Sequence, residues 1–216
     1  MKRKPRKPAN PPPAPPAGRR ARRQAETRAR ILRAALDLFA RQGYSSTTVE
    51  QITEAADVGK GTFFNYFPSK EYVMAGFGEM QLAKVEAALH DGARAGQPTR
   101  ETWRHLAHEL AREPGRSPSL VRGLLLANLS SDAVSKHMQR NLARGREILA
   151  RLITGGQQRG ELRTGSSPDE IARLFQQTFL GALLFWALDP SSSLAERLDK
   201  TFELFWSGVA AHSRQA

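Results

Sequence analysis

The chain contains no cysteine among its 216 residues, which excludes disulfide bonds, thiolate metal sites and cysteine nucleophiles. The expected compartment is therefore a reducing one, the cytoplasm. Long apolar runs are also missing. The longest, FLGALLFWAL at 179–188, is too short to span a bilayer and suits a buried helix. The basic N-terminus lacks the apolar core of a signal peptide, so we expect neither export nor a membrane partner.

Signatures of catalysis and of cofactor binding are equally scarce. The sequence GKG at 59–61 suggests a phosphate loop, but the Walker pattern needs glycine where Glu54 stands and serine or threonine where Gly61 stands. His105 and His108 could form a metal pair on one helical turn, although surface histidines are the simpler interpretation. No Gly-x-Ser-x-Gly elbow occurs. We therefore expect no enzyme, no cofactor and no metal.

Positive charge is abundant and unevenly placed. The formal net charge is +12, and residues 1–23 hold nine Lys and Arg side chains and no acidic one. This segment, MKRKPRKPANPPPAPPAGRRARR, is rich in proline and nearly free of large apolar side chains, so we expect a disordered arm. A basic arm on a nearly neutral body favours nucleic acid as a partner, and a solubilising tail is the alternative.

From Gln24 onward, apolar residues recur with helical spacing. In QAETRARILRAALDLFARQGY, the side chains of Ile31, Leu38 and Phe39 fall on one face of a helix. Gly43 occupies the position at which glycine commonly ends a helix. The sequence therefore predicts a long amphipathic first helix.

A second, short helix begins in STTVEQITEAADV, where two residues compete for the cap. Thr47 with Glu50 and Thr48 with Gln51 both fit a capping box, so the start is clear while the cap stays open. After a tight turn, VGKGTFFNYF predicts a third, short helix that ends at Pro68. A supporting helix, a short capped helix and a turn into a third helix constitute a helix-turn-helix arrangement.

Helical patterns continue through the rest of the chain, and no stretch alternates with the period of two that a strand requires. The further helices are expected over 70–93, 99–112, 119–129, 132–159, 168–188 and 194–211. The predicted fold class is all-α.

The run RILRAALDLFARQGYSSTTVEQITEAADVGKGTFFNYFPSKEYV at 30–73 resembles the tetracycline-repressor (TetR/AcrR) family of bacterial transcriptional regulators. Its most specific part is V-x-K-G-T-x-F-x-Y-F-x-S-K-E at 58–71. The resemblance implies a three-helix DNA-binding domain over 24–70 and an effector-binding and dimerisation domain over 71–216. It also implies a homodimer on palindromic operator DNA, most simply a repressor that a small hydrophobic or amphipathic ligand releases.

The resemblance further implies which residues meet DNA. Thr48 and Lys70 would contact phosphates, and the amide of Asn65 suits the edge of adenine. The family often has serine where this chain has Gly59 and tyrosine where it has Phe64, so we expect basic residues of the arm to supply attraction. The expected DNA-binding residues are Thr47, Thr48, Lys60, Gly61, Thr62, Phe64, Asn65, Tyr66, Lys70, Arg19, Arg20, Arg22 and Arg23.

Aromatic residues of the C-terminal part are the candidates for an effector pocket and for a dimer interface, with ordinary core packing as the alternative for each. The candidate pocket residues are Trp103, Phe175, Phe179 and Trp186. The candidate dimer residues, on the last two helices, are Phe185, Leu198, Phe202, Phe205 and Val209.

Two other hypotheses stay open at the level of sequence. One is a DNA-binding factor without an effector, and the other is a helical enzyme or carrier that keeps a vestigial motif. The sequence reveals neither the operator, nor the effector, nor the sign of regulation.

Overall fold

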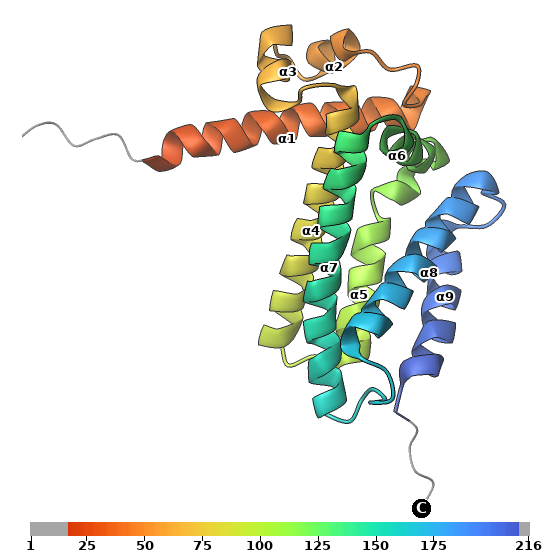
Figure 1. Ribbon diagram of the computed structural model, residues 1–216. Coiled ribbons are helices and arrows are strands. Elements are labelled where there is room, and N and C mark those ends of the chain that lie inside the picture. Colours follow the sequence, from red (N-terminus) through yellow and green to blue (C-terminus); the bar gives the residue numbers. More distant parts are fainter. Residues whose placement is uncertain (1–16, 212–216) are drawn as a thin grey trace, which may run out of the picture.

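The computed structural model describes residues 17–211, and Figure 1 shows these residues as a small head above an elongated helical body. The elements in chain order are α1 (Ala17–Gln42), α2 (Val49–Ala55), α3 (Lys60–Tyr66), α4 (Lys70–Arg94), α5 (Thr99–Ala111), a 3-10 turn (Pro114–Arg116), α6 (Pro118–Ser130), α7 (Asp132–Gln158), α8 (Pro168–Leu188) and α9 (Leu194–Val209). One isolated antiparallel bridge joins Leu162 to Ala210. The expected all-α fold is confirmed for this part of the chain.

The first helix is longer than the sequence pattern indicated. It begins at Ala17 rather than at Gln24, so the last part of the expected disordered arm is helical. The reason lies in the segment AGRRARR, which follows the final proline of the arm and is rich in alanine and arginine, two strong helix formers. Residues 1–16 of the expected arm lie outside the described residues. In Figure 1 the start of α1 projects beyond the head.

The head consists of α2 and α3 packed on α1. Thr48 is the cap of α2: its hydroxyl accepts from the N–H of Gln51, and the Gln51 side chain accepts from the N–H of Thr48. Gly43 follows α1 with a φ of 89°, and Asp57 has a φ of 50° in the turn between α2 and α3. Aspartate tolerates this left-handed conformation better than most residues, so the turn forms without glycine.

The core of the head extends past the expected domain boundary at residue 70. Phe63 and Phe67 are fully buried beneath α3, together with Val73 and Phe77 from the first two turns of α4. Residues of α6 and α7 join the same cluster: Leu120, Ala127 and Val134. At Gly123, α6 lies so close to the loop after α1 that a Cβ on this glycine would be 2.6 Å from the Cβ of Tyr44. The head therefore sits on the body through shared packing rather than through a flexible linker.

The core of the body is an aromatic cluster around Trp103, which is fully buried. The Trp103 ring centroid lies 4.9 Å from that of Phe175, in an edge-to-face arrangement. Leu198 and Phe202 of α9 belong to this core, with exposed fractions of 4% and 3%. The sequence assigned these two residues to the dimer interface, but their side chains are already buried within the protomer, because they lie on the inner face of α9.

The helix α8 has 21 residues, and by length and composition it is apolar enough to cross a membrane, with a mean hydropathy of 1.3. The sequence expectation rests on the shorter uninterrupted run at 179–188, whereas the helix as a whole passes this test. Within the protein, 44% of the most apolar 18-residue stretch of α8 is buried, since one face of the helix packs into the body core. It is the one helix of residues 17–211 that meets this criterion.

Candidate functional site

The outer face of α3 is open to solvent and carries small, polar and aromatic side chains. Lys60, Gly61, Phe64 and Asn65 are exposed, and Phe64 retains 51% of its accessible surface. A Cβ added at Gly61 would meet no other part of the protein within 4 Å. The inner face holds the buried Phe63, so α3 is anchored on one side and free to contact a partner on the other.

Lys60 is linked to the second helix of the head. Its Nζ lies 2.6 Å from Oε1 of Glu50, and hydrogen bonding by Lys60 lowers the pKa of the Glu50 carboxyl. Both side chains are exposed, so this pair contributes little to stability. The Lys60 ammonium can therefore exchange Glu50 for another anion.

Two of the expected DNA-binding residues, Thr47 and Lys70, make contacts within the protein. Thr47 is 1% exposed, and its hydroxyl donates to the carbonyl of Gly43 at 2.8 Å. The Nζ of Lys70 donates to the carbonyls of Tyr44 and Thr47 at 2.9 and 3.0 Å, and it lies 4.5 Å from the centre of the Tyr44 ring. These contacts tie the loop between α1 and α2 to the start of α4.

Glu71 extends the same network. Burial alone would raise its pKa, but hydrogen bonds from Ser69, from its own backbone N–H and from Tyr44, together with the charge of Lys70, lower it. The pKa of Tyr44 is raised, chiefly by burial and then by its hydrogen bond to Glu71. Glu71 is thus a carboxylate at neutral pH, and it holds Tyr44 beneath the head.

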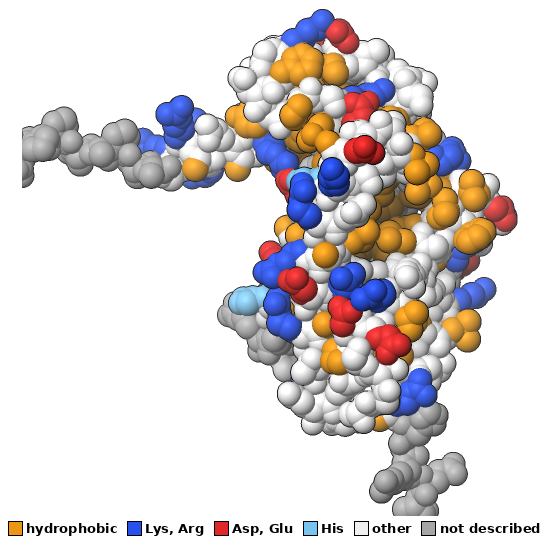
Figure 2. Space-filling view, viewed as in Figure 1, with side chains coloured by type: hydrophobic (Ala, Val, Ile, Leu, Met, Phe, Trp, Pro, Cys, Tyr) orange, Lys and Arg blue, Asp and Glu red, His pale blue; other side chains and the backbone are white. Residues whose placement is uncertain are grey.

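Below the head, a cavity of about 130 Å³ lies between α4, α5, α6, α7 and α8. Figure 2 shows hydrophobic side chains lining a hollow in this part of the surface. The wall is almost entirely apolar, and none of the described residues that line it is charged. Phe175 and Phe179 of the expected pocket set line this cavity, whereas Trp103 and Trp186 lie in the surrounding core.

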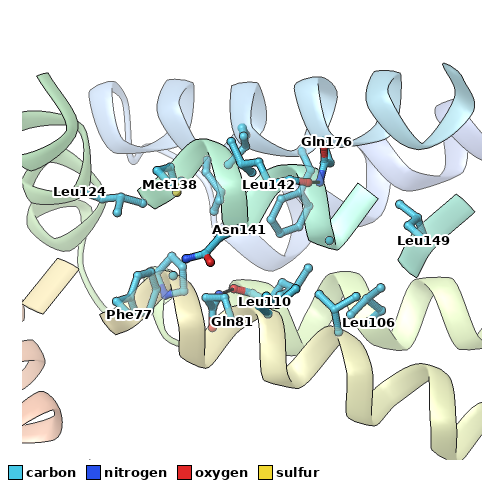
Figure 3. Close-up of a pocket in the computed structure, with 18 of the residues that line it drawn as sticks. Phe77, Gln81, Leu106, Leu110, Leu124, Met138, Asn141, Leu142, Leu149 and Gln176 are labelled. Carbon is cyan, nitrogen blue, oxygen red and sulfur yellow. Dashed lines mark hydrogen bonds between the residues drawn. The ribbon is translucent and has the colours of Figure 1, made fainter. Parts of the chain in front are cut away.

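The polar side chains that line the cavity are Gln81 of α4, Asn141 of α7 and Gln176 of α8. Figure 3 shows Asn141 projecting from α7 towards α4. Sequence reasoning missed these residues because it searched for aromatic side chains. The available signal was an amide within an otherwise apolar helical face, as with Asn141 between Met138 and Leu142.

The upper end of the cavity adjoins the head. Phe77 and Leu124 line the cavity and also pack in the head core. Beside them, Glu79 of α4 lies 2.5 Å from a guanidinium nitrogen of Arg28 on α1 and 2.9 Å from Nε2 of His137 on α7. The geometry at Nε2 of His137 is not that of a hydrogen bond. Glu79 thus connects α1, α4 and α7.

A second exposed feature is apolar and lies on α8 and α9. Leu174, Phe185 and Leu188 of α8 and Leu204 of α9 are 49%, 65%, 64% and 77% exposed. Phe205 and Val209 are partly buried against the body core. Along α8, positions 174, 181, 185 and 188 follow helical spacing, so the three large side chains form one stripe.

His105 and His108, for which surface histidines were the simpler interpretation, lie on α5, the first exposed and the second partly exposed. Nε2 of His108 lies 2.9 Å from a carboxylate oxygen of Asp199. Across residues 17–211, no group of three or more His, Asp or Glu side chains is placed to hold a metal ion.

Comparison with known proteins agrees with this arrangement. Residues 31–75 match the family described as bacterial regulatory proteins, tetR family. The transcriptional regulator AcuR of Cereibacter sphaeroides is 30% identical over 190 residues, covering 80% of this chain and 81% of AcuR. The structure of FadR from Thermus thermophilus, a TetR-family transcriptional repressor in complex with lauroyl-CoA, is 30% identical with a TM-score of 0.65, covering 88% of this chain and 98% of FadR. This chain belongs to the TetR family of bacterial transcriptional regulators.

Another relative matches over a similar share of the chain. The transcriptional repressor KstR of Mycolicibacterium smegmatis is 26% identical over 184 residues, covering 84% of this chain and 87% of KstR. The resemblance inferred from residues 30–73 is therefore confirmed, and so is the function of a DNA-binding transcriptional regulator.

Substitution of Lys70 by Met tests its role in the head. We expect the free energy of unfolding to fall by about 1–3 kcal/mol, because two carbonyls lose a charged donor. Lys60→Met, which removes an exposed pair, is the control and leaves stability unchanged. Urea unfolding without DNA measures both. Full stability of Lys70→Met together with weaker DNA binding would instead support a phosphate contact.

Proposed function

We propose that this regulator is a dimeric repressor that leaves its operator when a small apolar ligand enters the cavity between α4 and α7. The observation that carries the proposal is the position of that cavity, whose wall shares Phe77 and Leu124 with the core of the head. A ligand that displaces these side chains also changes the support of α3. As its relatives are bacterial transcriptional regulators, we place the protein in the cytoplasm, where the DNA is.

The proposed DNA-reading surface is the outer face of α3 with the start of α2. Asn65 is exposed and can read a base edge, and Lys60 can transfer from Glu50 to a phosphate. Thr48 lies at the cap of α2, where free N–H groups favour a phosphate oxygen. The remaining members of the surface are Gly61, Thr62, Phe64 and Tyr66.

Gly61→Ala separates DNA contact from folding. Alanine should stabilise α3 by up to about 1 kcal/mol, because glycine is unfavourable inside a helix. The added methyl meets no atom of the protein, but it stands where we place the DNA backbone, so we expect operator affinity to fall at least tenfold. Fluorescence anisotropy on a selected operator and thermal unfolding measure the two effects. Unchanged affinity would show that DNA does not approach Gly61.

Arg19, Arg20, Arg22 and Arg23 provide the second proposed contact. They are exposed on the projecting start of α1, where they form a basic helix rather than an extended arm. The head from 24 to 72 holds six basic and six acidic residues, so it brings no net attraction of its own. We place these arginines against phosphates that flank the half-site.

Replacing these four arginines by Gln should weaken operator binding and reduce its salt dependence. The slope of log K against log salt becomes shallower by about 0.9 for each phosphate that the variant no longer neutralises. Arg151→Gln with Arg163→Gln, on the body, is the control and leaves the slope unchanged. An identical slope in the fourfold variant would remove α1 from the interface.

The coupling between cavity and head runs through α4. Its first turns belong to the head core, and its next turns line the cavity. Glu79 holds α4 to Arg28 of α1 and to His137 of α7. A ligand that separates α4 from α7 would stretch these contacts and tilt α4. Operator DNA requires half-sites about 34–36 Å apart, so a small tilt favours the unbound form.

Gly145→Leu tests the effector role of the cavity. Gly145 is on α7, and a Cβ there would meet ordinary contacts at 3.5 Å from Gln176 and 3.9 Å from Leu82. Leucine therefore fills the space, and we expect operator binding to persist while ligands neither raise the melting temperature nor release DNA. Gly145→Ala fits without filling the cavity and keeps the response. Normal ligand release from Gly145→Leu would place the effector elsewhere.

The proposed dimer interface is the apolar stripe on α8 with Leu204 of α9. Leu198 and Phe202 are left out because they are buried within the protomer. Positions 181 on α8 and 208 on α9 are glycines with open space around them. Small residues at these positions permit α8 and α9 of one copy to approach those of a second copy closely. Association of two copies through these helices gives a four-helix bundle.

The double variant Phe185→Glu with Leu204→Glu should be monomeric, because association would bury unpaired carboxylates from both copies in the interface. Leu129→Glu on α6, where the side chain is 85% exposed, is the matched control and stays dimeric. Size-exclusion chromatography with light scattering measures both. A dimeric double variant would contradict this interface.

A further inference from the structure

Two side chains that line the cavity carry buried polar atoms that no described residue satisfies. Gln81 uses its Nε2 to donate to the carbonyl of Leu110 at 2.6 Å, and Gln176 uses its Nε2 to donate to the carbonyl of Leu142 at 2.8 Å. The remaining Oε1 of Gln81 and the Nδ2 of Asn141 are buried and have no hydrogen-bond partner among the described residues. One is an acceptor and the other is a donor.

These two atoms belong to the same stretch of the cavity wall. The Asn141 amide reaches α4 at Gly78, where a Cβ would lie only 2.9 Å from Nδ2. Glycine at this position makes room for the amide, and Gln81 follows one turn later on the same face of α4. Figure 3 shows Asn141 extending towards the segment that carries Phe77 and Gln81.

The chemistry of this pair restricts the ligand. A hydroxyl group both accepts a hydrogen bond and donates one, so it matches Nδ2 of Asn141 and Oε1 of Gln81 together. An ester or thioester carbonyl only accepts. A carboxylate also only accepts, and it would bury a charge in a cavity whose described lining has no cation to pair with it.

We infer that the effector is an uncharged, mainly apolar molecule whose hydroxyl group is bound between Asn141 and Gln81. This inference rests on the proposed role of the cavity as the effector site. The space of about 130 Å³ is close to that of an engineered apolar cavity of about 150 Å³ that binds benzene, so it has room for at least one ring or a short chain.

Three matched probes test the inference on the 216-residue chain: ethylbenzene, 4-ethylphenol and 4-ethylbenzoate. We expect 4-ethylphenol to bind about tenfold more tightly than ethylbenzene, and 4-ethylbenzoate to bind most weakly, in isothermal titration calorimetry. In Asn141→Leu, which is similar in size, the preference for the phenol over ethylbenzene disappears. Leu129→Met, at an exposed position outside the cavity, is the control and keeps the preference.

Asn141→Ala serves as a second variant if Asn141→Leu does not fold, and it should lose the same preference. Tightest binding by 4-ethylbenzoate or by lauroyl-CoA overturns the inference, and so does a phenol preference that survives in the Asn141 variants. The proposed function fails in a different way. In that case the probes bind in the cavity of the wild-type protein, yet none weakens its binding to the operator.

Discussion

The packing of α4 is the constraint on which the rest of this structure depends. One helix supplies Val73 and Phe77 to the core beneath α3 and then lines the cavity with Gln81 and its neighbours. Because cores are densely packed, a displacement of α4 at the cavity would also disturb the head core, to which the same helix contributes. The contacts of Lys70 with the loop between α1 and α2 make the first turn of α4 part of the head.

This arrangement explains how a cavity remote from the recognition helix can govern DNA binding without touching DNA. The ligand has to bind the released form more tightly than the form that fits the operator, and its binding energy is then the source of release. Glu79 contacts both Arg28 of α1 and His137 of α7, so these two helices and α4 meet at one carboxylate. The basic residues lie at the start of α1, so their proposed contact with DNA does not involve the cavity.

Much of the head was predictable from sequence, because its signals are local. The start of α2 and the tight turn into α3 are set by short-range hydrogen bonds and local residue preferences, although the choice of cap between Thr47 and Thr48 stayed open. The body was less predictable. Apolar spacing indicates its helices, but whether Leu198 faces its own core or a second copy depends on tertiary packing, which spacing does not specify. The amides in the cavity were missed because only aromatic side chains were considered, and the helical arginines were missed although their signal, the helix propensity of AGRRARR, is local.

The separation of the two heads in a dimer tests the central claim most directly. The chain has no cysteine, so Glu54→Cys on α2 places one spin label on each exposed α2. Double electron–electron resonance measures the distance between the two labels, first with the protein bound to operator DNA and then with the tightest ligand from a thermal-shift screen. We predict a narrow distribution on DNA and a shift of several ångströms, about 3–6 Å, with ligand, since half-site spacing is fixed by the DNA helix. Release of DNA by the ligand with an unchanged distance distribution would contradict this mechanism.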